Sequence, residues 1–222
     1  MSYELIIFDC DGTLVNSHDM NHSIMADIAN QYGDFSYTMK SVEEEYLGID
    51  YNKFFKMVSA KENIDIPDAA AQQCVDMALK KIPTMMHEID DVTEMLEMVS
   101  KHYPITVCSN ANKEIVWESL KAIGVDHFFD EQKIVAGRAM ATPKPAPDLF
   151  LLAAEKMGVA PEKCLVIEDS ATGVQGGVAA GMQVWASLAA SRDPKGQESA
   201  LKEAGASRVF DRLIHISETL DH

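Results

Sequence analysis

The stretch LIIFDCDGT at residues 5–13 places four apolar residues directly before two aspartates that are separated by one cysteine. An uninterrupted apolar run of this length is typical of a buried strand, and residues i and i+2 of a strand share one face. Asp9 and Asp11 are therefore expected to point into the same small volume, where two unpaired carboxylates would repel each other. A hard divalent cation such as Mg²⁺ relieves that repulsion, and Gly12 lets the chain turn sharply afterwards.

The same motif has two simpler interpretations, a turn that closes a strand and a calcium-binding loop. Aspartate and glycine both favour turns, so an ordinary turn stays open on this motif alone. The calcium loop is excluded, because its glycine stands at the sixth position of the loop whereas Gly12 stands at the fourth.

Composition limits the classes of partner and compartment. The chain has 222 residues, 47% of them apolar, which is enough for a buried core in one or two domains. A net charge of −16 argues against nucleic acid and anionic membranes as partners. The start of the sequence lacks the basic region of a signal peptide, and no apolar run approaches a membrane span. Since the four cysteines form no C-x-x-C pair, we expect reduced thiols and a cytoplasmic protein.

Apolar strands and helical patterns alternate along most of the chain. This alternation is typical of an α/β fold with a parallel sheet covered by helices on both faces. The strands after the first are predicted at residues 104–109, 133–136, 164–168, 183–185 and 208–210. The helices between them are predicted at about 92–102, 113–123, 147–157, 171–180 and 197–204.

Residues 15–82 break that alternation, because they carry helical patterns at about 20–32, 42–47, 51–62 and 69–80 and no convincing strand. We interpret them as a helical domain inserted after the first strand, with residues 1–14 and 83–222 forming the α/β core. Ordinary crossover helices packed on the sheet are the alternative.

Polar residues follow four of the predicted strands at the end where an open parallel sheet binds its ligands. Asp9 and Asp11 follow the first strand, and Ser109 and Asn110 end the second. Lys144 follows the third in a proline-rich loop, and Glu168, Asp169 and Ser170 end the fourth. Chance placement of such a set is improbable. Simpler roles remain open, namely helix caps for Ser109 and for residues 168–170, and a solvated loop lysine for Lys144.

In order and spacing, the motifs at Asp9-x-Asp11-Gly12-Thr13, Ser109, Lys144-Pro145 and Glu168-Asp169 resemble those of the haloacid dehalogenase superfamily. The resemblance covers nearly the whole chain and is greatest to the branch of phosphogluconate phosphatases and β-phosphoglucomutases. It implies a Rossmann-like core and an inserted α-helical cap.

The resemblance also implies roles for the residues at the strand ends. Asp9 is expected to be the nucleophile that forms an aspartyl-phosphate, and Asp11 the general acid and base. Lys144 and Ser109 are expected to neutralise and bind the phosphoryl group, with the backbone N–H groups of Cys10, Asp11 and Asn110 completing the cradle. Mg²⁺ is expected on the carboxylates of Asp9 and Asp169 and the backbone carbonyl of Asp11, with Glu168 assisting directly or through water.

The implied activity is hydrolysis of a small phosphorylated metabolite, because an acid at Asp11 suits a leaving group that needs a proton. Dehalogenases of the superfamily lack that acid. A β-phosphoglucomutase carries a cap histidine where Asn21 stands here, and a lysine and an arginine where Leu47 and Tyr51 stand, so the mutase is the second interpretation. A regulator that binds phosphometabolites without turnover is the third.

Substrate specificity is less well determined by the sequence. Gly48 lies in an expected cap loop that would approach the ligand, while Asn112 and Lys113 begin a helix whose N-terminus can hold an anion. We expect Asn112 and Lys113, with Asn21 or Arg138, to contact a second polar or anionic end of the substrate, such as the carboxylate of a sugar acid. A monomer or a weak homodimer is expected.

Overall fold

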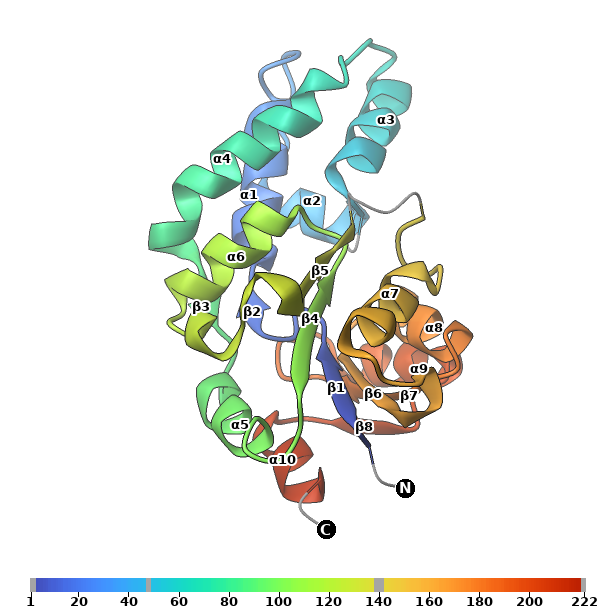
Figure 1. Cartoon of the computed structure of the whole chain (residues 1–222). Helices are drawn as coiled ribbons and strands as arrows, with labels where there is room; N and C mark the ends of the chain where they lie inside the picture. The colour runs from blue at the N-terminus through green and yellow to red at the C-terminus, as the bar shows by residue number, and fades with distance from the viewer. Residues whose placement is uncertain (1–2, 47–48, 138–141, 221–222) are drawn as a thin grey trace. The chain divides into compact units, whose positions relative to one another are not determined.

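The computed structural model describes residues 3–46, 49–137 and 142–220, which fall into two compact units (Figure 1). The core unit comprises Met1–Asn16 and His87–His222, and the helical unit comprises Ser17–Met86. The division lies two and four residues beyond the boundaries expected at 14/15 and 82/83. In the described part of the chain, no helix is long and apolar enough to cross a membrane.

Six parallel strands form the sheet of the core unit, in the order β5-β4-β1-β6-β7-β8. The central strand β1 pairs with β4 on one side and β6 on the other, and every residue of these three strands is buried. Burial on both faces explains why their sequences are nearly continuous apolar runs. The predicted sheet is therefore confirmed. Its strands are β1 (Leu5–Phe8), β4 (Ile105–Ser109), β5 (Ile134–Ala136), β6 (Cys164–Glu168), β7 (Gln183–Ser187) and β8 (Arg208–Phe210).

Helices lie on both sides of this sheet (Figure 1). Leu149, Phe150 and Ala153 of α7 pack against Leu5, Ile7 and Val166 on one face, where α8 and α9 also lie. On the other side lie α5 and α6, and α10 packs against α5. These helices are α5 (Val92–Val99), α6 (Lys113–Ala122), α7 (Asp148–Met157), α8 (Ala171–Ala179), α9 (Pro194–Ala204) and α10 (Ile214–Leu220).

The expected helix at 197–204 begins three residues too late. Asp193 is the N-cap of α9 and accepts a hydrogen bond from the Gly196 amide, and Pro194 occupies the first turn, as both residue types favour. Helix α10 and three short 3₁₀ helices were not predicted, because elements of three to seven residues show little periodicity. The 3₁₀ helices are η1 (Asp126–Phe128), η2 (Glu131–Lys133) and η4 (Pro161–Lys163).

A two-stranded antiparallel ribbon closes the point at which the chain leaves and re-enters the core unit. It joins β2 (Val15–Asn16) to β3 (His87–Glu88), with Val15 opposite Glu88 and Asn16 opposite His87. Sequence patterns did not predict this ribbon, since two residues per strand are too few to show an alternation.

The helical unit contains α1 (His18–Ala29), α2 (Met39–Tyr46), α3 (Tyr51–Glu62) and α4 (Ala69–Met85). Edge-to-face contacts join Tyr37, Tyr46 and Phe54 in its interior. The expected end of the last helix at residue 80 was wrong, because α4 continues through Pro83 to Met85. Proline removes one backbone donor, and here that loss falls within the last turn.

Candidate active site

The strand ends predicted to carry chemistry do meet in the core unit. Phe8 of β1 stands opposite Val107 of β4 and Ile167 of β6, so Asp9, Ser109 and Glu168 follow at neighbouring positions of one sheet edge. All three residues are buried although all three are polar. Buried polar groups need partners, and the contacts below supply them.

Lys144 is the centre of a buried ion cluster. Its Nζ lies 2.5 Å from Asp9 Oδ1 and 2.7 Å from Glu168 Oε1, and it donates a third hydrogen bond to the carbonyl of Cys108 at 3.0 Å. Only 4% of the lysine side chain is exposed. The solvated loop lysine is therefore excluded. Asn110 holds the backbone at Lys144, because its Oδ1 accepts a hydrogen bond from the Lys144 amide at 3.0 Å.

Charge and burial act against each other in this cluster. Burial lowers the pKa of Lys144, but the charges of Asp9 and Glu168 and the hydrogen bonds to them outweigh it, so the pKa is raised. Burial, together with the charges of Glu168 and Asp11, raises the pKa of Asp9 to about 8, although Lys144 opposes that shift. One ammonium thus does not compensate the acids gathered around it.

Glu168 is held at both oxygens of its carboxylate. Oε1 accepts from Lys144, and Oε2 accepts from the amides of Asp169 and Ser170 and from the Ser170 hydroxyl. Ser170 also caps α8, since its Oγ accepts from the Gly173 amide at 3.1 Å. The helix-cap interpretation of this motif therefore holds for Ser170, while Glu168 anchors the lysine.

The carboxylates of Asp9, Glu168 and Asp169 offer ligand atoms that all lie within 4.8 Å of one another. Burial raises the pKa of Asp169 well above its ordinary range, and the charges of Glu168 and Asp9 add to that effect. Three buried acids face one buried lysine, so a divalent cation fits both the charge and the oxygen donors of this cluster. Gly12 leaves room for the Asp169 carboxylate in this cluster. The φ of Gly12 is +86°, and a Cβ there would lie 2.1 Å from Asp169 Oδ2.

Asp11 and Ser109 face each other beside this cluster. The Ser109 hydroxyl donates to Asp11 Oδ2 at 3.3 Å and accepts from the Ala111 amide at 3.0 Å. Ser109 does not cap the following helix, because α6 begins at Lys113 and its N-cap position is Asn112. A buried hydroxyl and a partly exposed carboxylate therefore stand at the carboxyl ends of adjacent strands.

The sequence model of the family of haloacid dehalogenase-like hydrolases matches residues 6–187. These residues include every motif in this cluster. The chain belongs to this family. The family and the hydrolase class expected from the sequence are thereby confirmed.

Relatives of this haloacid dehalogenase-like hydrolase include a plant protein and a bacterial phosphatase. Protein SUPPRESSOR OF QUENCHING 1, chloroplastic, from Arabidopsis thaliana is 34% identical over 96% of the chain, which spans only 20% of that protein. Phosphorylated carbohydrates phosphatase from Thermotoga maritima is 28% identical over 91% of the chain and 92% of its own length. A haloacid dehalogenase-like protein of unknown function from Agrobacterium tumefaciens shares the fold, with a TM-score of 0.82, 26% identity and coverage of 99% and 98% of the two chains.

The remaining predicted site residues of the hydrolase belong to both units. Cys10 is buried directly after Asp9, and Lys113 begins α6 with Asn112 before it. The Asn112 Oδ1 is buried without a hydrogen-bond partner among the described residues. In the helical unit, Asn21 Oδ1 accepts from the Tyr51 hydroxyl at 2.7 Å. Leu47, Gly48 and Arg138 lie outside the described residues.

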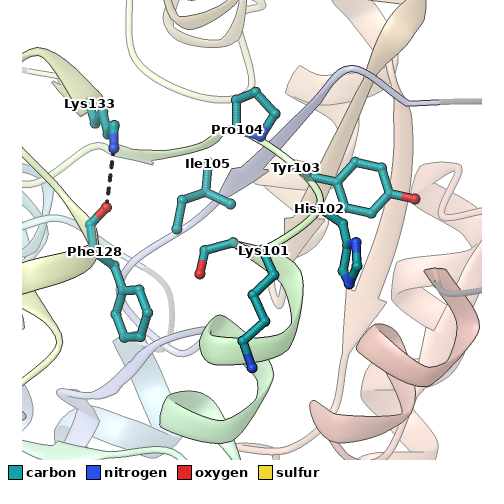
Figure 2. A pocket seen from close by; sticks show the side chains of 8 residues that line it. Lys101, His102, Tyr103, Pro104, Ile105, Phe128 and Lys133 are labelled. Atoms are coloured by element: carbon teal, nitrogen blue, oxygen red, sulfur yellow. Dashed lines mark hydrogen bonds between the residues drawn. The ribbon is translucent and has the colours of Figure 1, made fainter.

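A cavity of about 260 Å³ lies at the other end of β4 and is separate from this site (Figure 2). Ile105, the first residue of β4, lines it, whereas Ser109 is the last residue of that strand. Lys101 and Lys133 also line it, and the Lys133 Nζ donates to the Phe128 carbonyl at 3.4 Å (Figure 2). The cavity shares no residue with the acidic cluster.

Gly173 is a supporting residue that sequence reasoning missed. A Cβ at this position would lie 1.7 Å from Glu168 Oε1, and the glutamate is fully buried. Replacing a helical glycine by alanine ordinarily stabilises a helix by up to about 1 kcal/mol. We expect the opposite for Gly173→Ala, a loss of about 1–3 kcal/mol in the free energy of unfolding, because the anchored carboxylate has no room to move. Urea unfolding measures this difference.

The control for that measurement is Gln175→Ala on the exposed side of the same helix. The substitution removes no contact with Glu168, so the urea concentration at the midpoint of unfolding is expected to stay near that of the unchanged protein. A Gly173→Ala protein as stable as the Gln175→Ala protein contradicts the packing described here.

Proposed function

We propose that this hydrolase is a phosphatase that moves the phosphoryl group of a small phosphorylated metabolite first to Asp9 and then to water. The observation that carries the proposal is the pairing of buried Asp9 with Lys144, next to a second acid at Asp11. A phosphoryl group is anionic and a carboxylate is a weak nucleophile, so charge neutralisation is the main requirement.

Lys144 meets part of that requirement. Its ammonium group holds one Asp9 oxygen at 2.5 Å, which fixes the orientation of the carboxylate that attacks phosphorus. We assign to Glu168 the role of holding Lys144, since the glutamate already accepts four hydrogen bonds. The lysine then also neutralises the oxygens of the incoming phosphoryl group.

The metal in this proposal is Mg²⁺, held by the carboxylates of Asp9 and Asp169 and the backbone carbonyl of Asp11, with Glu168 assisting. Hard oxygen donors and the excess of buried negative charge favour such an ion. When bound, it would neutralise charge on the phosphoryl oxygens.

Asp11 is proposed as the general acid and base. In the first step it gives a proton to the leaving alkoxide, so that the bond from phosphorus to that oxygen breaks as the bond to Asp9 forms. In the second step it takes a proton from the water that attacks the aspartyl-phosphate, so that the bond from phosphorus to Asp9 breaks, inorganic phosphate leaves and the Asp9 carboxylate is restored. Ser109, with the backbone N–H groups of Cys10, Asp11 and Asn110, is proposed to bind the phosphoryl oxygens.

The substrate class is proposed to be sugar phosphates or sugar-acid phosphates. The relative from Thermotoga maritima is named for phosphorylated carbohydrates, and its match extends over 91% of this chain. Residues 15–82 are proposed to serve as a cap that closes over the site and excludes macromolecules. Asn21, Gly48, Asn112 and Lys113 are proposed to contact the substrate beyond its phosphate.

A panel of phosphosugars tests this function. With Mg²⁺ present, we expect release of inorganic phosphate from at least one hexose phosphate or sugar-acid phosphate. Excess EDTA is expected to lower that rate at least about 100-fold, and added Mg²⁺ to restore it. Formation of an isomer that depends on a bisphosphate primer would establish the mutase instead. Binding of phosphosugars without any turnover would establish the regulator.

A further inference from the structure

Gln197 connects a distant helix to the acidic cluster. It lies in the first turn of α9, and its side-chain Nε2 donates a hydrogen bond of 2.6 Å to the main-chain carbonyl of Asp169, 28 residues earlier. The acceptor is a carbonyl between the end of β6 at Glu168 and the start of α8 at Ala171, so it lies outside the hydrogen-bonded strand. The contact joins two neighbouring β-α segments of the core unit.

This hydrogen bond completes the restraint of Asp169. The amide of Asp169 donates to Glu168 Oε2 at 3.0 Å, so both polar groups of its peptide backbone are held. Its carboxylate lies against Gly12, where even a methyl group would come within 2.1 Å of Oδ2. A side chain with a fixed backbone and a close neighbour has few directions left, and here it points toward Asp9 and Glu168.

Gln197 is itself held in place by the start of its helix. Asp193 accepts hydrogen bonds from the amides of Gly196 and Gln197, one through its side chain at 3.2 Å and one through its carbonyl at 3.0 Å. Pro194 restricts the first turn. The donor therefore comes from a rigid element, and such elements position a site more accurately than loops do.

We propose that Gln197 is a positioning residue that sets the direction of the Asp169 carboxylate and thereby the affinity of the site for Mg²⁺. The inference rests on the proposed function, in which Asp169 is a metal ligand. Partners that orient a ligand contribute roughly 10–100-fold to metal affinity or activity.

The test is calorimetric titration of Mg²⁺ into metal-free full-length protein carrying Gln197→Leu, which keeps the bulk of the side chain and removes the donor. We expect the Kd for Mg²⁺ to rise about 10-fold, while kcat at saturating Mg²⁺ stays within about threefold of the unchanged protein. A merely structural role would lower the Tm of the metal-free protein and leave the Kd unchanged.

Two further variants make the outcome decisive. Ser199→Ala on the same helix is the control, because the Ser199 hydroxyl donates its hydrogen bond to Glu203, and the Kd of that variant is expected to stay at the starting value. Asp169→Asn is the reference for the metal site. If Asp169→Asn loses Mg²⁺ binding and Gln197→Leu keeps a Kd within about twofold, the role of Gln197 is refuted and the proposed function stands.

If Asp169→Asn binds Mg²⁺ normally, the proposed metal site is wrong and the inference falls with it. Should Gln197→Leu fail to fold, Gln197→Ala replaces it in the same titration. A Kd about 10-fold higher then supports the role of Gln197, and a Kd within about twofold refutes it.

Discussion

Asp9→Asn is expected to lower phosphate release by about 10⁴-fold or more, the largest effect on activity in this protein. The amide keeps the shape of the side chain and cannot attack phosphorus as a carboxylate does. It also removes a negative charge that is paired with Lys144. The measurement is steady-state phosphate release with the best substrate of the phosphosugar panel at saturating Mg²⁺.

Asp76→Asn provides the matched control for this experiment. Asp76 is an exposed aspartate on α4 that accepts a hydrogen bond from Gln72, so the same chemical change there should leave kcat unaltered. Circular dichroism of the Asp9→Asn protein must show the native helix content, so that loss of folding is not mistaken for loss of chemistry. A residual rate within about tenfold of the unchanged protein would falsify the nucleophilic role.

Lys144→Met is expected to have the largest effect on stability. The change leaves Asp9 and Glu168 buried without their shared cation, and breaking one side of a buried ion pair costs about 3–5 kcal/mol. In a protein of this size that corresponds to a Tm lower by roughly 6–20 °C. Differential scanning calorimetry of the metal-free protein measures it.

The control is Lys202→Met, which breaks the pair of Lys202 and Glu198 on the surface of α9. Exposed pairs contribute little, so that variant should melt close to the unchanged protein. Equal melting temperatures for Lys144→Met and Lys202→Met would mean that the buried cluster contributes nothing to folding.

The sequence was sufficient to predict the sheet and the edge where the polar residues meet. Buried parallel strands are continuous apolar runs, and the carboxyl ends of such strands converge whatever lies between them. This is why Asp9, Ser109 and Glu168 could be brought together from positions some 60 to 160 residues apart.

The partners of these residues were harder to predict. The salt bridge from Lys144 to Glu168 depends on the path of one loop, and no pattern of residue spacing encodes it. The hydrogen bond from Gln197 to Asp169 depends on where α9 begins, and the predicted start of that helix was three residues too late. In the sequence Gly173 resembles any helical glycine, and only the fold places the Glu168 carboxylate beside it. Contacts between side chains distant in sequence follow from tertiary packing and not from periodicity.

The ribbon of β2 and β3 marks the place where the helical unit is inserted into the chain of the core unit. Asn16 and His87 are opposite one another in the ribbon, so the 70 residues of Ser17–Met86 begin and end at adjacent positions of the core unit. Two antiparallel strands can equally be joined by a two-residue hairpin turn. A hairpin turn could therefore take the place of Ser17–Met86 between the same two strands, and the strands of the core unit would keep their order.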